Sequence, residues 1–167
     1  MRNVKRLSAW ILTIALAVSL FALVACVDKP QAQELTELTL PTLAENQMAV
    51  IIQNGKNDYT SITVTLGKSG VEAKTVEDVL AYLKKEGAID LKWHDTEYGK
   101  YIDTLGKLTP STSEWVAVFT SNSAEFDTSA WAQTRKAGDV TLTTSIVGVS
   151  ELSVAPGYII YFELASY

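Results

Sequence analysis

Apolar and polar side chains alternate along the chain in a way that predicts an early β-hairpin. From Ile62 to Leu66 apolar residues alternate with threonines, which is the period of a half-buried strand, and the predicted strand runs over residues 59–66. A compact apolar run at residues 48–52 precedes it. Asn54-Gly55 lies between the two segments and favours the positive-φ turn of a hairpin.

A different period follows and predicts one helix over about residues 76–86. Thr75 is a typical N-cap residue, and Asp78 three residues later nearly completes a capping box. Two lysines in the last turn suit the helix dipole, and Gly87 ends the helix. The apolar residues recur at helical spacing on one face: Val76, Val79, Leu80 and Leu83.

The rest of the chain is mostly of strand character. Residues 101–105, 115–119, 140–146 and 158–164 are predicted strands, separated by segments that contain glycine and proline. The polar stretch over residues 120–138 has no clear period. Two strands, one helix and then several strands predict an α+β fold, β-grasp-like, in which a mixed sheet packs on one main helix.

The first 25 residues have the three parts of an export signal. Three basic residues precede an apolar run over residues 9–23, which is shorter than the ~20 residues of a membrane-spanning helix. Leu23-Val24-Ala25-Cys26 follows and resembles a lipobox, in which the cysteine takes a diacylglycerol and cleavage makes it the new N-terminus. The alternative is an uncleaved signal anchor, but the only cysteine lies where the lipobox needs it.

We therefore predict residues 1–25 to be a signal peptide and Cys26 the lipidation site of a membrane-anchored, extracytoplasmic lipoprotein. Each buried methylene contributes ~0.8 kcal/mol, so the chains of a diacylglycerol hold a protein stably. The mature domain then has no free thiol and no disulfide. Val27 stands where an aspartate commonly marks inner-membrane retention, so outer-membrane anchoring stays open for a host with two membranes.

Charge narrows the range of partners. The net charge is −5, and loss of residues 1–25 removes three basic residues and no acidic one, which makes the mature charge −8. Such a surface repels phosphate backbones and anionic headgroups. We expect no nucleic-acid partner, and contact with the membrane through lipid alone.

Residues 26–46 are predicted to be the lipidated cysteine and a tether, and residues 47–167 a single domain. The segment contains two prolines, acidic residues and repeated threonine, a composition typical of an extended spacer. Its leucines allow an alternative, a short edge strand that packs on the domain. These leucines are Leu35, Leu38, Leu40 and Leu43.

Several short segments occur in an order that resembles a known family. They are residues 75–80, residues 98–105, Trp115 at the start of a strand, residues 148–152 and residues 156–160. From about Ile62 to Leu164 the chain resembles the small domain shared by the C-terminal part of transcobalamin and many bacterial surface lipoproteins. The resemblance implies a β-grasp fold of the soluble-ligand-binding type without catalytic activity.

In transcobalamin this domain closes over one face of a corrinoid, beside a large helical domain. This sequence has no counterpart of that helical domain, so cobalamin is not the cofactor we expect, although the resemblance keeps it open. Two further departures are the longer stretch after the tryptophan strand and Gly157-Tyr158, where the family usually has Gly-Asp. These departures affect the choice of ligand more than the fold.

Catalytic motifs are incomplete. Gly67-Lys68-Ser69 lacks the earlier glycine of a phosphate loop, because Ile62 stands there, and residues 148–152 end in leucine instead of the glycine of a nucleophile elbow. His94 is the only histidine, and lipidation consumes the only cysteine, so ordinary zinc ligation lacks a ligand set. We expect no catalytic residue, no metal and no cofactor besides the diacylglycerol on Cys26.

Aromatic residues are the better candidates for recognition, because Trp and Tyr combine an apolar face with a polar group. We expect Trp115, at the start of a strand, to lie in the core. The protein would be a non-enzymatic binding module for a small molecule, a glycan or a surface protein. The alternative is a structural accessory domain that contacts another protein in an envelope or uptake complex. The candidate ligand-binding residues are Trp93, His94, Tyr98, Tyr101 and Trp131.

Overall fold

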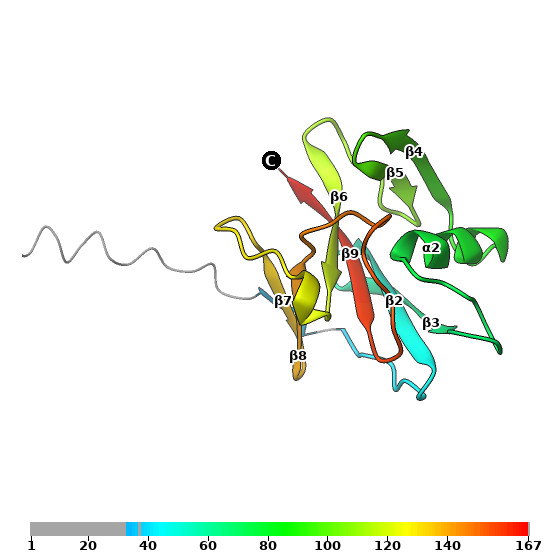
Figure 1. Ribbon diagram of the computed structural model, residues 1–167. Coiled ribbons are helices and arrows are strands. Elements are labelled where there is room, and N and C mark those ends of the chain that lie inside the picture. The colour runs from blue at the N-terminus through cyan, green and yellow to red at the C-terminus, as the bar shows by residue number, and fades with distance from the viewer. Residues whose placement is uncertain (1–32, 37, 167) are drawn as a thin grey trace, which may run out of the picture. The chain divides into compact units, whose positions relative to one another are not determined.

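The computed structural model describes residues 33–36 and 38–166, which form mainly strands (Figure 1). The predicted signal peptide and Cys26 lie outside the described residues. Within the described part of the chain, no helix is long and apolar enough to cross a membrane. The elements are β1 (Gln33–Glu34), β2 (Gln47–Gly55), β3 (Asp58–Thr65), α2 (Val76–Lys85), β4 (Leu91–Thr96), β5 (Gly99–Leu105), β6 (Glu114–Thr120), the 3-10 helix η1 (Ser123–Glu125), β7 (Thr134–Ala137), β8 (Val140–Thr144) and β9 (Ile159–Ser166).

Seven of the strands form one curled, mixed sheet in the order β1-β7-β8-β6-β9-β2-β3. β1 pairs with β7 and β2 pairs with β9 in parallel, whereas the other neighbours in this sheet are antiparallel. β4 and β5 form a separate antiparallel hairpin on the same side of the drawing as α2 (Figure 1).

β2 has the continuous apolar run of a strand that is covered on both faces. Met48, Val50 and Ile52 belong to one buried cluster and Ala49 and Ile51 to a second, because successive side chains point to opposite faces of the sheet. All five are at most 1% exposed. The two clusters make the two halves of the core, one on each face.

The predicted β2–β3 hairpin is confirmed, with its turn displaced by two residues. The strands pair from Gln47 and Thr65 to Gly55 and Asp58, so the turn lies after Gly55 and not at Asn54-Gly55. Asn57 supplies the positive φ, at 60°. Asparagine tolerates this conformation better than most residues.

The predicted helix is confirmed as α2, and its cap holds the charge of Asp78. The Asp78 N–H donates to Thr75 Oγ1 at 3.4 Å, and Asp78 Oδ2 accepts from the N–H groups of Lys74 at 2.8 Å and Thr75 at 3.0 Å. These backbone donors, Lys74 first, keep the pKa of Asp78 below its usual value. The apolar face of α2 adds four residues to the first cluster: Val76, Val79, Leu80 and Leu83.

The predicted α+β, β-grasp-like class is wrong, because the fold is mostly β. One α-helix of ten residues accompanies nine strands in the described residues. The sheet also has a second buried cluster on the face opposite the helix cluster, so the core is not confined to the face that α2 covers. β4 and β7 were not predicted, because both are rich in polar and charged residues and lack a clear apolar alternation.

The edge strand that was the alternative to a tether is present as β1. Gln33 and Glu34 pair in parallel with Arg135 and Lys136 of β7, and the Leu35 N–H donates to the Lys136 carbonyl at 2.7 Å. Two of the four leucines of this segment are buried in the second cluster, and the other two pack against it. A tether stays a prediction for the residues before β1, which lie outside the described residues.

Candidate functional site

Four of the five candidate ligand-binding residues belong to the β4–β5 hairpin, and the pairing of its strands divides them. Trp93 lies opposite Ile102, and His94 lies opposite Tyr101. Neighbouring positions on a strand point to opposite faces, so Trp93 and Ile102 share one face while His94 and Tyr101 share the other. Ile102 belongs to the first core cluster, and Trp93 packs against that cluster. The hairpin therefore directs Trp93 inward, and His94 and Tyr101 outward.

Lysine side chains flank the half-buried Trp93. The ammonium groups of Lys84 and Lys100 lie 6.0 and 5.8 Å from the centre of the Trp93 ring. Lys100 also donates to Asp95 Oδ1 at 2.6 Å, and this hydrogen bond raises the pKa of Lys100 above its ordinary value. Trp93 thus serves mainly as packing beneath the hairpin, with two lysine ammonium groups over its ring.

His94 is held on the outer face by an acidic partner. Its Nδ1 lies 2.9 and 3.0 Å from the two carboxylate oxygens of Asp103, and its ring centre is 5.3 Å from that of Tyr101. A carboxylate that orients a histidine also occurs in hydrolase triads, but such a site needs a nucleophile at the other ring nitrogen. Among the described residues no serine or threonine is hydrogen-bonded to His94. The contact orients an aromatic surface.

The tip of the hairpin carries the most exposed aromatic side chain of this group. Tyr98 is 84% exposed and Tyr101 38%. Both line an open hollow of about 670 Å³ that also includes Thr96, Glu97, Lys100 and Gly148. An aromatic face beside an ammonium and a carboxylate can stack on a ring and hydrogen-bond its substituents.

The tip is fixed to the rest of the domain by Ser150. The Thr96 hydroxyl donates to the Gly99 carbonyl at 2.7 Å within the turn, and the Lys100 N–H donates to Ser150 Oγ at 2.9 Å. Gly99 has a φ of 96°, and a Cβ there would lie 2.7 Å from Ser150 Oγ. Glycine is therefore required by both conformation and space. Ser150 and Gly148 were missed as site residues, because their sequence pattern indicates only a turn.

Trp131 lies at a different hollow from the hairpin residues. It is 87% exposed and lines a hollow of about 300 Å³ together with β6 residues from Trp115 to Val118. Its loop is held by Asp127, whose carboxylate accepts from the N–H and the hydroxyl of Ser129, and Ser129 Oγ accepts from the Trp131 N–H at 3.2 Å. Trp115 is half-buried and packs against the second core cluster. The structure thus separates Trp131 from the other four candidates.

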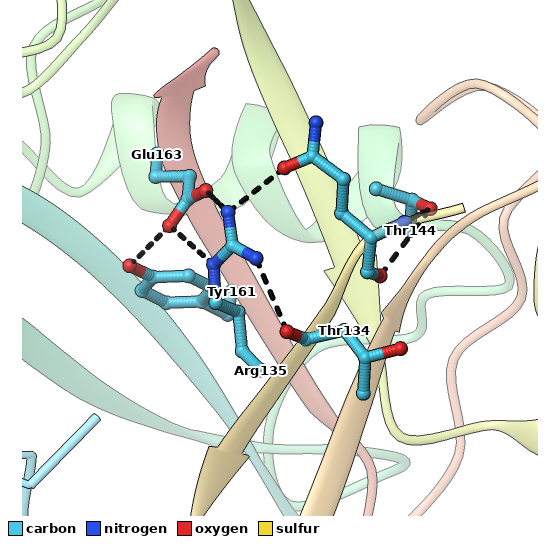
Figure 2. Close-up of polar contacts among 6 residues, drawn as sticks. Thr134, Arg135, Thr144, Tyr161 and Glu163 are labelled. Atoms are coloured by element: carbon cyan, nitrogen blue, oxygen red, sulfur yellow. Dashed lines mark hydrogen bonds and ion pairs between the residues drawn. The ribbon is translucent and has the colours of Figure 1, made fainter. Parts of the chain in front are cut away.

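A buried polar network on the second face of the sheet was not predicted (Figure 2). Arg135 and Glu163 are 9% and 5% exposed and form an ion pair. The Arg135 guanidinium also donates to Gln133 Oε1 at 2.9 Å. The Tyr161 hydroxyl donates to Glu163 Oε2 at 2.8 Å. Burial first, and then the charge of Glu163, raise the pKa of Tyr161 above its ordinary value. In the described residues no buried side-chain nitrogen or oxygen is left without a hydrogen bond, so the polar atoms of this buried network are satisfied within the domain.

The described residues contain no group of three or more His, Cys, Asp or Glu side chains that could hold a metal ion. The acidic residues near His94 are engaged in pairs instead. Asp103 contacts His94 and Asp95 contacts Lys100.

No known protein family and no curated protein matches the sequence. A candidate metal-binding protein from Ruminococcus gnavus ATCC 29149 is similar in structure over 74% of this chain and 99% of its own, with 15% identity and a TM-score of 0.48. Haptocorrin in complex with Cbi is similar over 77% of this chain and 27% of its own, with 10% identity and a TM-score of 0.49. At these identities the likenesses assign neither a ligand nor an activity to the chain.

Proposed function

We propose that the protein is a non-enzymatic binding module that a lipid on Cys26 anchors to the extracytoplasmic face of a membrane. Its recognition surface is the tip of the β4–β5 hairpin, and its ligand is a small molecule or a glycan. The observation that carries the proposal is the position of Tyr98, which is 84% exposed on a turn that hydrogen bonds fix to the domain.

An exposed tyrosine on a fixed turn is well suited to stacking. A ligand ring that covers the Tyr98 face removes apolar surface of both partners from water, which contributes about 25 cal/mol per Å². Because Ser150 already holds the backbone of the turn, binding does not have to order it. Lys100 and Glu97 line the same hollow and provide a donor and an acceptor for hydroxyl groups.

The membrane anchor rests on the sequence. The lipobox-like segment ends at the only cysteine, and the predicted mature net charge of −8 opposes attraction of the whole domain to anionic headgroups. A diacylglycerol on Cys26 would keep the hairpin close to the membrane surface and to ligands that arrive there.

The test uses the full chain with its lipid, extracted in a neutral detergent, on a glycan array and in thermal-shift assays with ring-containing small molecules, corrinoids included. We expect at least one glycan or small molecule to bind and to raise the melting temperature, since a ligand of the native state stabilises it by mass action. Tyr98→Ala should abolish the effect. Trp131→Ala is the matched control, because it also removes an exposed aromatic side chain but lies at the other hollow. Equal binding by Tyr98→Ala and the parent would contradict the proposal.

A second candidate function is a structural accessory domain that contacts another protein. The observation that favours it is the exposure of apolar side chains away from the hairpin, at Trp131 (87%) and Ile146 (63%). A protein partner would cover such residues. Failure of every small ligand, together with capture of a defined envelope protein by the lipidated chain, would favour this function.

A further inference from the structure

Strand β6 has a neighbour along the whole of one edge and along only one end of the other. β9 pairs with every residue of β6. β8 pairs only with Phe119 and Thr120, after which the Ser145 N–H donates to the Val118 carbonyl at 3.0 Å. The chain then turns away, because the Ile146 N–H donates to the Glu125 carbonyl at 3.0 Å. Figure 1 shows the first half of β6 extending past the β7–β8 pair.

The backbone groups that point to this open edge can be assigned from the ladder. In an antiparallel pair, alternate residues direct both their N–H and C=O to the same neighbour. The Ser121 N–H donates to Ile159 on the β9 side, and the Val118 carbonyl accepts from Ser145 on the other side. Val116, two residues before Val118, therefore directs its N–H and C=O to the open edge. Within residues 33–36 and 38–166, neither group forms a hydrogen bond with another backbone group.

The open edge forms one wall of the second hollow. Residues 115–118 line it over roughly 10 Å, at ~3.4 Å per residue step. Trp131, which is 87% exposed, and Asp127 line the same hollow. The hollow thus combines backbone N–H and C=O groups that face no partner strand, a large apolar side chain and a carboxylate.

We propose that this hollow is a docking site for an extended, basic peptide segment of another protein, which adds a strand to β6. An open strand edge pairs with extended backbone and not with a helix or a globular surface. The peptide would exchange hydrogen bonds with Val116, place an apolar side chain on Trp131, and direct a lysine or arginine to Asp127.

Charge favours a basic partner over a second copy of this chain. Asp127 and Glu114 lie at the hollow and at the start of β6, and the whole chain carries a net charge of −5. Pairing of two β6 edges would bring these carboxylates together in both copies, and like charges at an interface oppose association. A segment with alternating basic and apolar residues matches both the carboxylates and the tryptophan.

The test uses a labelled nine-residue peptide of alternating lysine and valine, whose fluorescence anisotropy is measured. The peptide is titrated with the full lipidated chain in neutral detergent, and empty micelles are the blank. We expect saturable binding that becomes about tenfold weaker or more when the peptide amides that face β6 are N-methylated, because each lost hydrogen bond costs roughly that factor. A peptide of alternating glutamate and valine should not bind. Equal affinity for the methylated peptide, or no binding of the lysine peptide, would overturn the proposal.

Protein variants locate the site. Val116→Pro removes the N–H that faces the hollow, and because this N–H does not serve the β9 ladder, the substitution is tolerated as on an edge strand. We expect it and Trp131→Ala to weaken peptide binding about tenfold or more, whereas Tyr98→Ala leaves it unchanged. Loss of binding in Tyr98→Ala, or dimers of the parent that Val116→Pro dissociates, would also overturn the proposal. If Val116→Pro does not fold, the N-methylated peptide still tests the proposal. None of these results tests the hairpin site, which has its own experiment.

Discussion

Arg135 on β7 and Glu163 on β9 form a buried ion pair, although β8 and β6 lie between their strands in the sheet (Figure 2). The guanidinium contacts both carboxylate oxygens, with Nε donating to Oε2 at 3.2 Å and Nη2 donating to Oε1. In a flat sheet, three strand spacings would separate β7 and β9 by about 14 Å. The sheet is curled, which shortens this separation on the second face, where the two side chains meet.

We expect Glu163→Gln to destabilise the protein by about 3 kcal/mol. Loss of the carboxylate leaves the Arg135 guanidinium buried without a counter-charge, which is the costly way to break such a pair. Denaturant unfolding followed by far-ultraviolet circular dichroism measures the change in the free energy of unfolding. The double variant Arg135→Met/Glu163→Gln should recover part of the loss, because it removes the unpaired charge.

The matched control is Lys107→Ala, which breaks the exposed pair between Lys107 and Asp58 at 3.3 Å. Exposed pairs contribute about 0–1 kcal/mol. Similar losses for Glu163→Gln and Lys107→Ala would show that burial of the Arg135–Glu163 pair does not matter to stability.

The cap of α2 predicts a dependence of stability on pH. Because the pKa of Asp78 is lower in the folded than in the unfolded protein, its contribution is complete above the ordinary value of 3.8 and is lost as pH falls through the folded value. Asp78→Asn should cost about 1 kcal/mol at neutral pH, and the gap to the parent should narrow below about pH 4. Parallel urea titrations at several pH values measure this gap. A gap that is constant down to pH 2 would contradict the role of the charge.

Apolar period identified the elements that cover or form the core. It predicted β2, β3, α2, β5, β6, β8 and β9, because their apolar residues form compact runs or recur at strand or helix spacing. β4 and β7 escaped, because β4 has one buried residue and β7 alternates buried positions that include a charged one, Arg135. The wrong fold class followed from these two missed strands. Together with the second core cluster, they make the fold mostly β instead of a sheet that packs on one helix.

We expect Ser150→Ala to loosen the recognition hairpin without touching its aromatic face. The Lys100 N–H would lose its acceptor, at a cost of about 1 kcal/mol. Hydrogen exchange of the Lys100 amide should accelerate, and affinity for any ligand of the hairpin should fall, while Tyr98 stays in place. Unchanged exchange at Lys100 would show that Ser150 does not hold the turn.

Cys26→Ser should abolish labelling of the protein by a metabolically incorporated fatty acid. The thioether with diacylglycerol needs the Cys26 thiol, and serine does not replace it at a lipobox. In membrane fractionation, Cys26→Ser should be lost from the membrane fraction that detergent solubilises. Tyr98→Ala is the control and should stay in that fraction. Continued labelling of Cys26→Ser would contradict the lipoprotein prediction.

The sequence indicated which aromatic residues are candidates, but not which face of the hairpin each of them occupies. Sequence alone placed Trp93, His94 and Tyr98 in one irregular segment, since an exposed hairpin has no apolar period to reveal it. The pairing of β4 with β5 decides that Trp93 points inward while His94 points outward. The Arg135–Glu163 pair was out of reach, because no local pattern links residues that only the curled sheet brings together.

The pairing of β1 with β7 has a mechanical consequence. A pull on the N-terminal end of the chain reaches the fold first at two paired residues, Gln33 and Glu34, and then at the buried Leu35. A pull along the axis of β1 loads its few hydrogen bonds to β7 in shear and transmits force to the strand that carries Arg135 and follows the Trp131 loop. For a protein held at its N-terminus, tension at the attachment point would act on the peptide-docking hollow before it reached the recognition hairpin.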